Sequence, residues 1–248
     1  MAKKEYSNKN TTIKQNKTKT AIFFEGCFNK YINPQTKNAV EKILLKSNIM
    51  LIKKNFHCCG ISYLSDGDIE TFKKLAQKNI SLIDKETDYI LTDCATCNDV
   101  LKTYKEYLEE QTVTDISNKV TSITELISNI EFTSNKKLKI AIHKPCHEDF
   151  DIENFVKNNI KNIEYIPINS YDKCCGFAGS FAIKHSEIST KISKQKVQDY
   201  IDNKVDIILT TCPACLLGLE QGIIEHNKLN TLTPMNLIVF LAKYCCED

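Results

Sequence analysis

The cysteines of this 248-residue chain are its most informative residues for chemistry, because ten of the twelve recur in one order. That order is a lone cysteine, then an adjacent pair, then a CxxC motif, and it occurs twice. Thiolates gathered in such numbers are typical ligands of metals and of iron-sulfur clusters. The first set is Cys27, Cys58, Cys59, Cys94 and Cys97, and the second set is Cys146, Cys174, Cys175, Cys212 and Cys215.

The spacing of the two sets indicates an internal duplication. Cys146 follows Cys27 by 119 residues, Cys174 follows Cys58 by 116, and Cys212 follows Cys94 by 118. Agreement this close over three separate motifs is the pattern of a repeated structural unit. We therefore expect each set to belong to one copy of the same module.

The elements that must position the thiols are predicted from hydrophobic patterning. Short apolar runs end just before each cysteine motif and predict buried strands. Periodic segments between them predict helices, and strands that alternate with helices favour a parallel sheet with right-handed crossovers. The predicted strands are 20–27, 49–53, 88–92, 138–146, 163–168 and 205–210, and the predicted helices open at 33–34 or span 68–83, 113–130, 186–201 and 233–244.

The fold class predicted from this order is α/β, with two tandem modules that each hold a small parallel sheet flanked by helices. We place the first module at residues 21–131 and the second at 138–248, with a polar boundary between them. Residues 1–20 are rich in lysine and nearly free of apolar side chains, which predicts a disordered polar tail. Because parallel strands end at the same edge of a sheet, all five thiols of a module should converge there.

Iron-sulfur chemistry accounts for the thiols better than three alternatives do. A 4Fe-4S cluster takes four cysteines, and each module offers five. Zinc prefers four ligands, commonly as two CxxC pairs, and each module has one such pair. A dithiol redox site would use only the CxxC motif, and a buried apolar role would not explain the repeated order. The adjacent pair needs an irregular turn to face one centre, which Gly60 and Gly176 would permit.

The remaining polar groups near the motifs carry weaker signals. We expect His57, His143 and His147 to support the sulfur sites rather than to ligate, because the thiols already suffice. Carboxylates close to the motifs suggest capping and solvation only, since no paired arrangement indicates acid-base work. Cys245 and Cys246 lie outside the repeat and are interpreted as incidental residues of a frayed terminus. The carboxylates in question are Asp93, Asp99, Glu148 and Asp172.

Composition excludes several other functions. The formal net charge is +2, from 33 basic and 31 acidic residues, so no strong field favours nucleic acid. No apolar run approaches the roughly 20 residues that span a bilayer, and none follows the first basic residues as in a secretory signal. We therefore expect a cytoplasmic location without a direct membrane span. The chain has seven glycines and no GxGxxG motif, so no flavin or nicotinamide site is expected on it.

The motifs together resemble the CCG (cysteine-rich domain) iron-sulfur proteins. That family includes the iron-sulfur subunit of glycolate oxidase, the lactate-utilization iron-sulfur protein and the heterodisulfide reductase B subunit. The resemblance rests on both sets, on the glycine after each cysteine pair and on the flanking residues from Phe24 to Cys27 and from His143 to His147. It covers nearly the whole chain from Ala21 onward.

The resemblance implies that each set holds a 4Fe-4S cluster, which is noncubane in the heterodisulfide reductase relative, and that the modules are related by a pseudo-twofold axis. It also implies an electron-transfer subunit of a lactate- or glycolate-oxidizing complex, with a flavin-containing or ferredoxin-type subunit as partner. Long relatives carry a ferredoxin domain with its own cysteines, and residues 1–20 contain none. Two alternatives stay open, a disulfide or thiol reductase that uses a cluster as its catalytic centre and a zinc-bound scaffold module.

Overall fold

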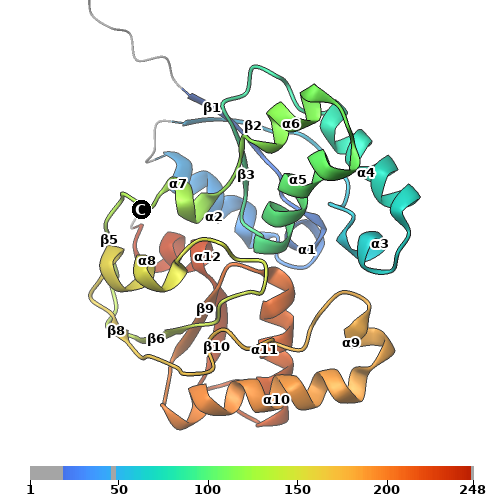
Figure 1. Ribbon diagram of the computed structural model, residues 1–248. Coiled ribbons are helices and arrows are strands. Elements are labelled where there is room, and N and C mark those ends of the chain that lie inside the picture. The colour runs from blue at the N-terminus through green and yellow to red at the C-terminus, as the bar shows by residue number, and fades with distance from the viewer. Residues whose placement is uncertain (1–18, 46–48, 247–248) are drawn as a thin grey trace, which may run out of the picture.

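The computed structural model describes residues 19–45 and 49–246 (Figure 1). The described chain holds two four-stranded parallel sheets, one in each half, and both are flanked by helices. This confirms the predicted α/β fold of two tandem modules. Residues 1–18 of the predicted polar tail lie outside the described residues, and Lys19 and Thr20, predicted as its end, belong to the first strand instead because they pair with Ile49 and Met50.

The first sheet has the order β2-β1-β3-β4, with every neighbouring pair parallel. Ala21 lies in the middle of the sheet, beside Leu51 on one side and Tyr89 on the other. The strands are short and rich in β-branched residues, which favour the extended backbone. They are β1 (Lys19–Phe23), β2 (Ile49–Ile52), β3 (Tyr89–Thr92) and β4 (Val120–Ser122).

The second sheet repeats this arrangement with the order β8-β6-β9-β10. In both sheets the first strand of the module lies between its second and third strands, and the fourth strand pairs with the third. The shared order is what an internal duplication predicts. The strands are β6 (Lys139–Ile142), β8 (Glu164–Tyr165), β9 (Ile207–Thr210) and β10 (Thr233–Asn236), while β5 (Phe132–Thr133) and β7 (Ile160–Lys161) form a small pair of their own.

Helices cover the sheets and several begin at recognisable caps. Asp68 caps α4 by accepting from Thr71 N, and Asn236 caps α12 by accepting from Ile238 N. Pro213 stands in the first turn of α11, where its missing N–H costs nothing. The helices are α1 (Cys27–Tyr31), α2 (Gln35–Leu45), α3 (Ile61–Ser65), α4 (Ile69–Ser81), α5 (Ala95–Tyr107), α6 (Gln111–Ser117), α7 (Ile123–Leu126), α8 (Ile152–Asn159), α9 (Phe181–Lys184), α10 (Ser186–Asp202), α11 (Pro213–Glu225) and α12 (Leu237–Tyr244).

One predicted element is wrong. The segment 113–130 forms the end of α6, strand β4 and helix α7, rather than a single helix. Val120 lies opposite Ile90 of β3, so pairing with the edge of the sheet takes this short stretch out of the helix. The corresponding segment of the second module, predicted as helical over 233–244, likewise starts with β10 before α12 begins.

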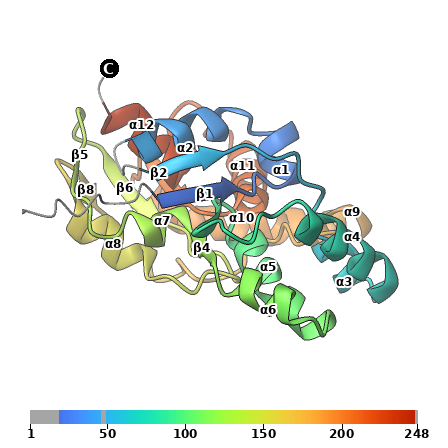
Figure 2. The same cartoon turned by 90° about the horizontal axis from the view of Figure 1, so that it is seen from above.

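A central apolar core joins the two modules. It contains Ala21 and Val40 from the first module together with Ile140 and Phe240 from the second. Helix α2 packs against α12 across the boundary (Figure 2), and side chains of α7 and α8 belong to the same cluster. Each module also has an apolar cluster of its own on the other face of its sheet. The two halves therefore share one continuous interior, which fixes the position of one strand edge against the other.

No helix within residues 19–45 and 49–246 is long and apolar enough to cross a bilayer.

Candidate metal centre

The five thiols of the first set come from the ends of three parallel strands. Cys27 opens α1 after β1, the pair Cys58 and Cys59 follows β2, and Cys94 and Cys97 follow β3. Cys27 Sγ lies 3.7 Å from Cys58 Sγ. Hydrogen-bonding contacts continue from Cys58 to Cys59, from Cys59 to Cys97 and from Cys97 to Cys94. Each thiol of the first set thus lies within hydrogen-bonding range of another one.

Glycine makes the adjacent pair possible. Gly60 has φ 93° and Gly176 has φ 85°, a left-handed conformation that glycine adopts without strain. A Cβ atom at Gly60 would lie 2.8 Å from the ring of Phe72, and one at Gly176 would lie 2.8 Å from the carbonyl oxygen of Ser189. The turn after each cysteine pair is therefore closed to any larger residue.

The second set repeats the arrangement after β6, β8 and β9, and its outer end is open to solvent. Cys146 and Cys174 are exposed, whereas Cys175 and Cys215 are buried. Hydrogen-bonding contacts join Cys146 to Cys174 and Cys174 to Cys175. They continue from Cys175 to Cys215 and from Cys215 to Cys212. The ligand atoms of His143, Cys175 and Cys215 all lie within 4.8 Å of one another, close enough to share one metal ion.

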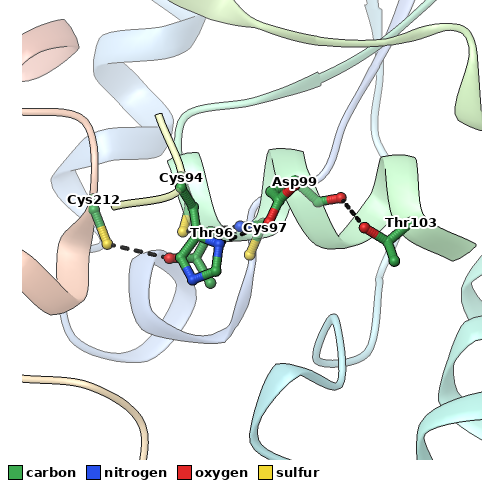
Figure 3. A network of polar contacts seen from close by, with 7 residues as sticks. Cys94, Thr96, Cys97, Asp99, Thr103 and Cys212 are labelled. Atoms are coloured by element: carbon green, nitrogen blue, oxygen red, sulfur yellow. Dashed lines mark hydrogen bonds and ion pairs between the residues drawn. The ribbon is translucent and has the colours of Figure 1, made fainter. Parts of the chain in front are cut away.

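The two sets meet at the beginnings of α5 and α11. Cys94 and Cys212 form a hydrogen-bonding contact across the modules, and Thr96 Oγ1 lies 3.5 Å from Cys212 Sγ (Figure 3). The backbone supports this contact, because Ala95 N donates to Thr211 O at 3.0 Å. The sequence predicted two separate groups at two strand edges. The structure places these edges against each other, so the ten sulfurs form one unbroken line of contacts.

The environment favours the thiolate form at three positions along this line. Hydrogen bonds from Cys27 and Cys59 lower the pKa of the Cys58 thiol, and those from Cys174 and Cys215 do so for Cys175. Hydrogen bonds from Cys215 and Cys94 lower the pKa of Cys212 in the same way. Thiolates are the form that binds metals, and the contacts within the line favour that form at these three sulfurs.

The interface between the modules buries two carboxyl groups, contrary to the expectation that they are only solvated. Asp93 accepts a 2.7 Å hydrogen bond from Asn236 Nδ2, and Glu148 accepts from Thr211 Oγ1. Burial raises the pKa of both groups, to a large extent for Asp93. Asp93, just before Cys94, therefore ties the first module to the second beside the thiols, whereas Glu148 is bound to Thr211 within the second module. Periodicity could not reveal this role, because it depends on how the two modules pack.

The three histidines near the motifs have different surroundings. His143 is buried beside Cys175, where it helps to lower the pKa of that thiol, and among the described residues neither of its ring nitrogens has a hydrogen-bond partner of ordinary geometry. His147 Nδ1 lies 2.7 Å from Asp99 Oδ2 and links the second module to α5. His57 is held through its backbone N–H, which donates to Asn79 Oδ1. His143 is thus the histidine best placed to contact a bound group.

The residues present fit an iron-sulfur group. The donors are sulfurs that follow one another along adjoining strand edges, and the buried imidazole of His143 lies beside Cys175 and Cys215. Gly26 leaves space beside Cys97 Sγ, because any side chain there would place its Cβ only 3.1 Å from that sulfur. Oxygen ligands of the kind that calcium or magnesium requires do not dominate the site.

The last two cysteines of the chain are not part of a frayed end. Cys246 is 3% exposed and belongs to the central core, and half-buried Cys245 packs against the same core. Neither belongs to the line of ten contacting sulfurs described above. They are therefore structural residues of the module boundary.

Comparison with known proteins identifies the family to which a chain with two such modules and two such sets of thiols belongs. The model of the cysteine-rich domain called CCG matches residues 21–102 and again residues 140–220. The chain belongs to this family of cysteine-rich domain proteins.

Several curated relatives are named as iron-sulfur proteins. An uncharacterized iron-sulfur protein of Methanocaldococcus jannaschii is 28% identical over 89% of this chain and 46% of its own length. Lactate utilization protein A of Oceanobacillus iheyensis is 26% identical over 69% of this chain and 75% of its own length. A probable glycolate oxidase iron-sulfur subunit of Bacillus subtilis is 25% identical over 91% and 54%. Other relatives are named as subunits of a fumarate reductase (CoM/CoB) and of a heterodisulfide reductase.

The chain spans about half the length of the curated relatives that it matches first. Among solved structures, a hypothetical protein from Helicobacter pylori superposes with a TM-score of 0.63 over 94% of this chain and 53% of that one, at 12% sequence identity. That likeness concerns the fold. The family and the names of the relatives support an iron-sulfur cluster in this chain.

Proposed function

We propose that the first and second sets each hold one 4Fe-4S cluster, and that the chain is an electron-transfer subunit of a complex that oxidizes a 2-hydroxy acid such as lactate or glycolate. The observation that carries this proposal is the line of ten contacting sulfurs at the adjoining strand edges. Each set supplies five thiols, which covers the four ligands of such a cluster. The bound clusters would supply one-electron transfer.

The protein's part is to hold and shield the thiolates. Six of the ten cysteines are buried, namely Cys59, Cys94, Cys97, Cys175, Cys212 and Cys215. Backbone donors reach the sulfurs as well: Gly60 N donates to Cys58 Sγ at 3.4 Å, Cys97 N to Cys94 Sγ at 3.4 Å and Gly176 N to Cys174 Sγ at 3.3 Å. Such hydrogen bonds stabilise charge on sulfur and influence reduction potentials. The contact between Cys94 and Cys212 makes ligands of the two clusters direct neighbours.

The proposed partners are a flavin-containing subunit that oxidizes the substrate and a ferredoxin-type subunit that relays the electrons. Support comes from relatives named as a glycolate oxidase subunit and as lactate utilization protein A. Within the described residues the polar groups that surround the thiols form no recognisable site for a hydroxy acid. Oxidation of the substrate is therefore assigned to the partner.

The test is metal and sulfide analysis of anaerobically purified protein, combined with electron paramagnetic resonance. We expect iron and acid-labile sulfide for two clusters. Cys59→Ser and Cys175→Ser should each lose the cluster of one set, whereas Cys245→Ser, outside both sets, should keep both. Colourless protein with stoichiometric zinc would support the scaffold alternative and refute this function. Unchanged iron in Cys59→Ser and Cys175→Ser would refute the ligand assignment.

A second candidate function, reduction of a disulfide or thiol compound at a cluster, is favoured by the accessibility of the outer thiols. Cys146 and Cys174 are exposed, and a cavity of about 370 Å³ opens beside Cys27 and Cys58. A substrate could therefore approach either set from solvent. Turnover of a disulfide by the purified chain with a reduced viologen dye as electron donor would establish this activity. Absence of turnover by protein that carries both clusters would leave electron relay as the function.

A further inference from the structure

The two modules differ on the long helix that faces the turn after the cysteine pair. In both, the buried residues of that helix include three along one face that correspond between the modules. Phe72 would meet a Cβ at Gly60, and Ser189 would meet one at Gly176, so these two residues occupy equivalent places. The same offset of 117 residues relates the others. The face is Phe72, Ala76 and Asn79 on α4, and Ser189, Ser193 and Lys196 on α10.

The third position of this face carries a charge in the second module only. Lys196 is 4% exposed, and its Nζ donates to the carbonyl oxygen of Ser170, in the loop that leads to Cys174. Asn79, its neutral counterpart, donates to Cys58 O at 3.0 Å and contacts Tyr104 OH at 3.1 Å. Both side chains hold a cysteine loop in place, but only one brings a cation into the interior.

The Lys196 ammonium lies within electrostatic range of the second set. Burial lowers its pKa to about 8, against the opposing influence of Asp172, Cys175, Cys215 and Asp199. The group is therefore mainly protonated at neutral pH. Helix α10 packs against α11, the helix that Cys212 caps and that carries Cys215 (Figure 1). Asp172 is exposed and Asp199 is half-buried, whereas Lys196 is buried, so water screens the two carboxylates more than it screens the ammonium.

We propose that Lys196 stabilises the reduced state of the cluster held by the second set, so that an electron entering the chain comes to rest in the second module. The inference rests on the proposed function above. Reduction adds one electron, and hence one negative charge, to a cluster, and the electron comes from a one-electron donor such as dithionite in the assay. A fixed positive charge in a poorly solvated place favours the form with the extra negative charge.

The size of the effect follows from Coulomb's law. A unit charge about 10 Å away, at an effective dielectric constant of about 20, changes the equilibrium constant for reduction by on the order of tenfold. For a one-electron couple a tenfold change corresponds to about 59 mV. A shift of this size is easily measured, and the first cluster, which has Asn79 in place of a cation, should not share it.

The experiment is a redox titration of both clusters, followed by electron paramagnetic resonance, in wild type and three variants. Lys196→Gln removes the buried charge and should lower the potential of the second cluster alone. Lys196→Arg keeps the charge and should retain most of the wild-type value. Lys194→Gln removes an exposed charge from the same helix and should change neither cluster. Signals are assigned with Cys59→Ser, which leaves the second cluster, and Cys175→Ser, which leaves the first.

Each outcome decides a different point. An unchanged second potential in Lys196→Gln, or an equal fall in both potentials, would overturn the inference while the proposed function stands. Absence of iron and sulfide from the wild type would overturn the proposed function itself. If Lys196→Gln fails to bind its second cluster, the single-cluster proteins decide. The cluster left in Cys59→Ser must then have the higher potential, and the reverse order would refute the proposal.

Discussion

Replacement of Gly26 by alanine should disturb the first set of thiols more than an equal change elsewhere. Gly26 has φ 71° and ψ 159°, a combination that is essentially restricted to glycine. Alanine there should cost about 1–3 kcal/mol from the backbone alone. In addition, the new Cβ would lie 3.1 Å from Cys97 Sγ, closer than the 3.4–4 Å of ordinary contact. The strain therefore falls on a proposed cluster ligand as well as on the fold.

Gly67 offers the matched control for this experiment. It too has a positive φ, of 82°, but a Cβ there would meet nothing within 4 Å. Gly67→Ala should therefore cost about 1–2 kcal/mol and leave the thiols undisturbed. Iron content and urea unfolding of both variants give the comparison. We expect less iron in Gly26→Ala, lost from the first cluster, and full iron in Gly67→Ala. Full iron in both variants would show that Cys97 does not need its present position.

Three further predictions concern the supports of the site. Ser193→Ala removes the 2.8 Å hydrogen bond that the Cys175 carbonyl accepts from Ser193 Oγ. The free energy of unfolding should fall by about 1–3 kcal/mol, measured by thermal melting, even though the equivalent residue of the first module is Ala76. Tyr104→Phe removes the 2.8 Å hydrogen bond to Cys59 O and should destabilise the protein by about 1–3 kcal/mol, whereas half-buried Tyr107→Phe serves as the control; equal unfolding midpoints would contradict the assigned bond. Hydrogen bonds from Lys184 and Ser180 lower the pKa of Asp66, so the contact stabilises the fold at pH values above the ordinary carboxyl pKa of 3.8, and this stabilisation is lost as the pH falls below that value. Asp66→Asn should remove that part of the acid dependence of the urea midpoint. An unaltered pH profile would show that the contact is not formed in solution.

Local patterns were sufficient to predict the framework of the site. Apolar runs that stop at a cysteine motif mark buried parallel strands, and β1, β3, β6 and β9 all end shortly before one. The repeat itself then places each motif at the same edge of its sheet. Strand β4 escaped prediction because Val120 becomes extended only by pairing with a distant strand. Propensity over a short window cannot anticipate such a partner.

The packing of the two modules against each other could not be predicted from hydrophobic patterning. Periodicity places Cys94 and Cys212 at two equivalent strand ends, but their contact depends on how the sheets pack through the central core. The buried state of Asp93 and of Lys196 has the same origin, since both side chains lie on faces that only tertiary packing covers. Aspartate and lysine are usually exposed, so residue type alone predicts a solvent-exposed position for both side chains, whereas the structure buries them.

The central core shared by both halves has a consequence for how such a chain can arise. Helix α2 of the first module packs against α12 of the second, and α7 and α8 belong to the same cluster. Because α8 takes the place of α2 in the second module and α7 takes the place of α12 in the first, both halves contribute the same two elements to the contact. A contact of that kind is self-complementary, as in a homodimer with twofold symmetry. A single ancestral module could have formed it with its own copy before fusion joined the two genes. Cleavage of the present chain between residues 131 and 137 should accordingly leave the fragments bound to each other.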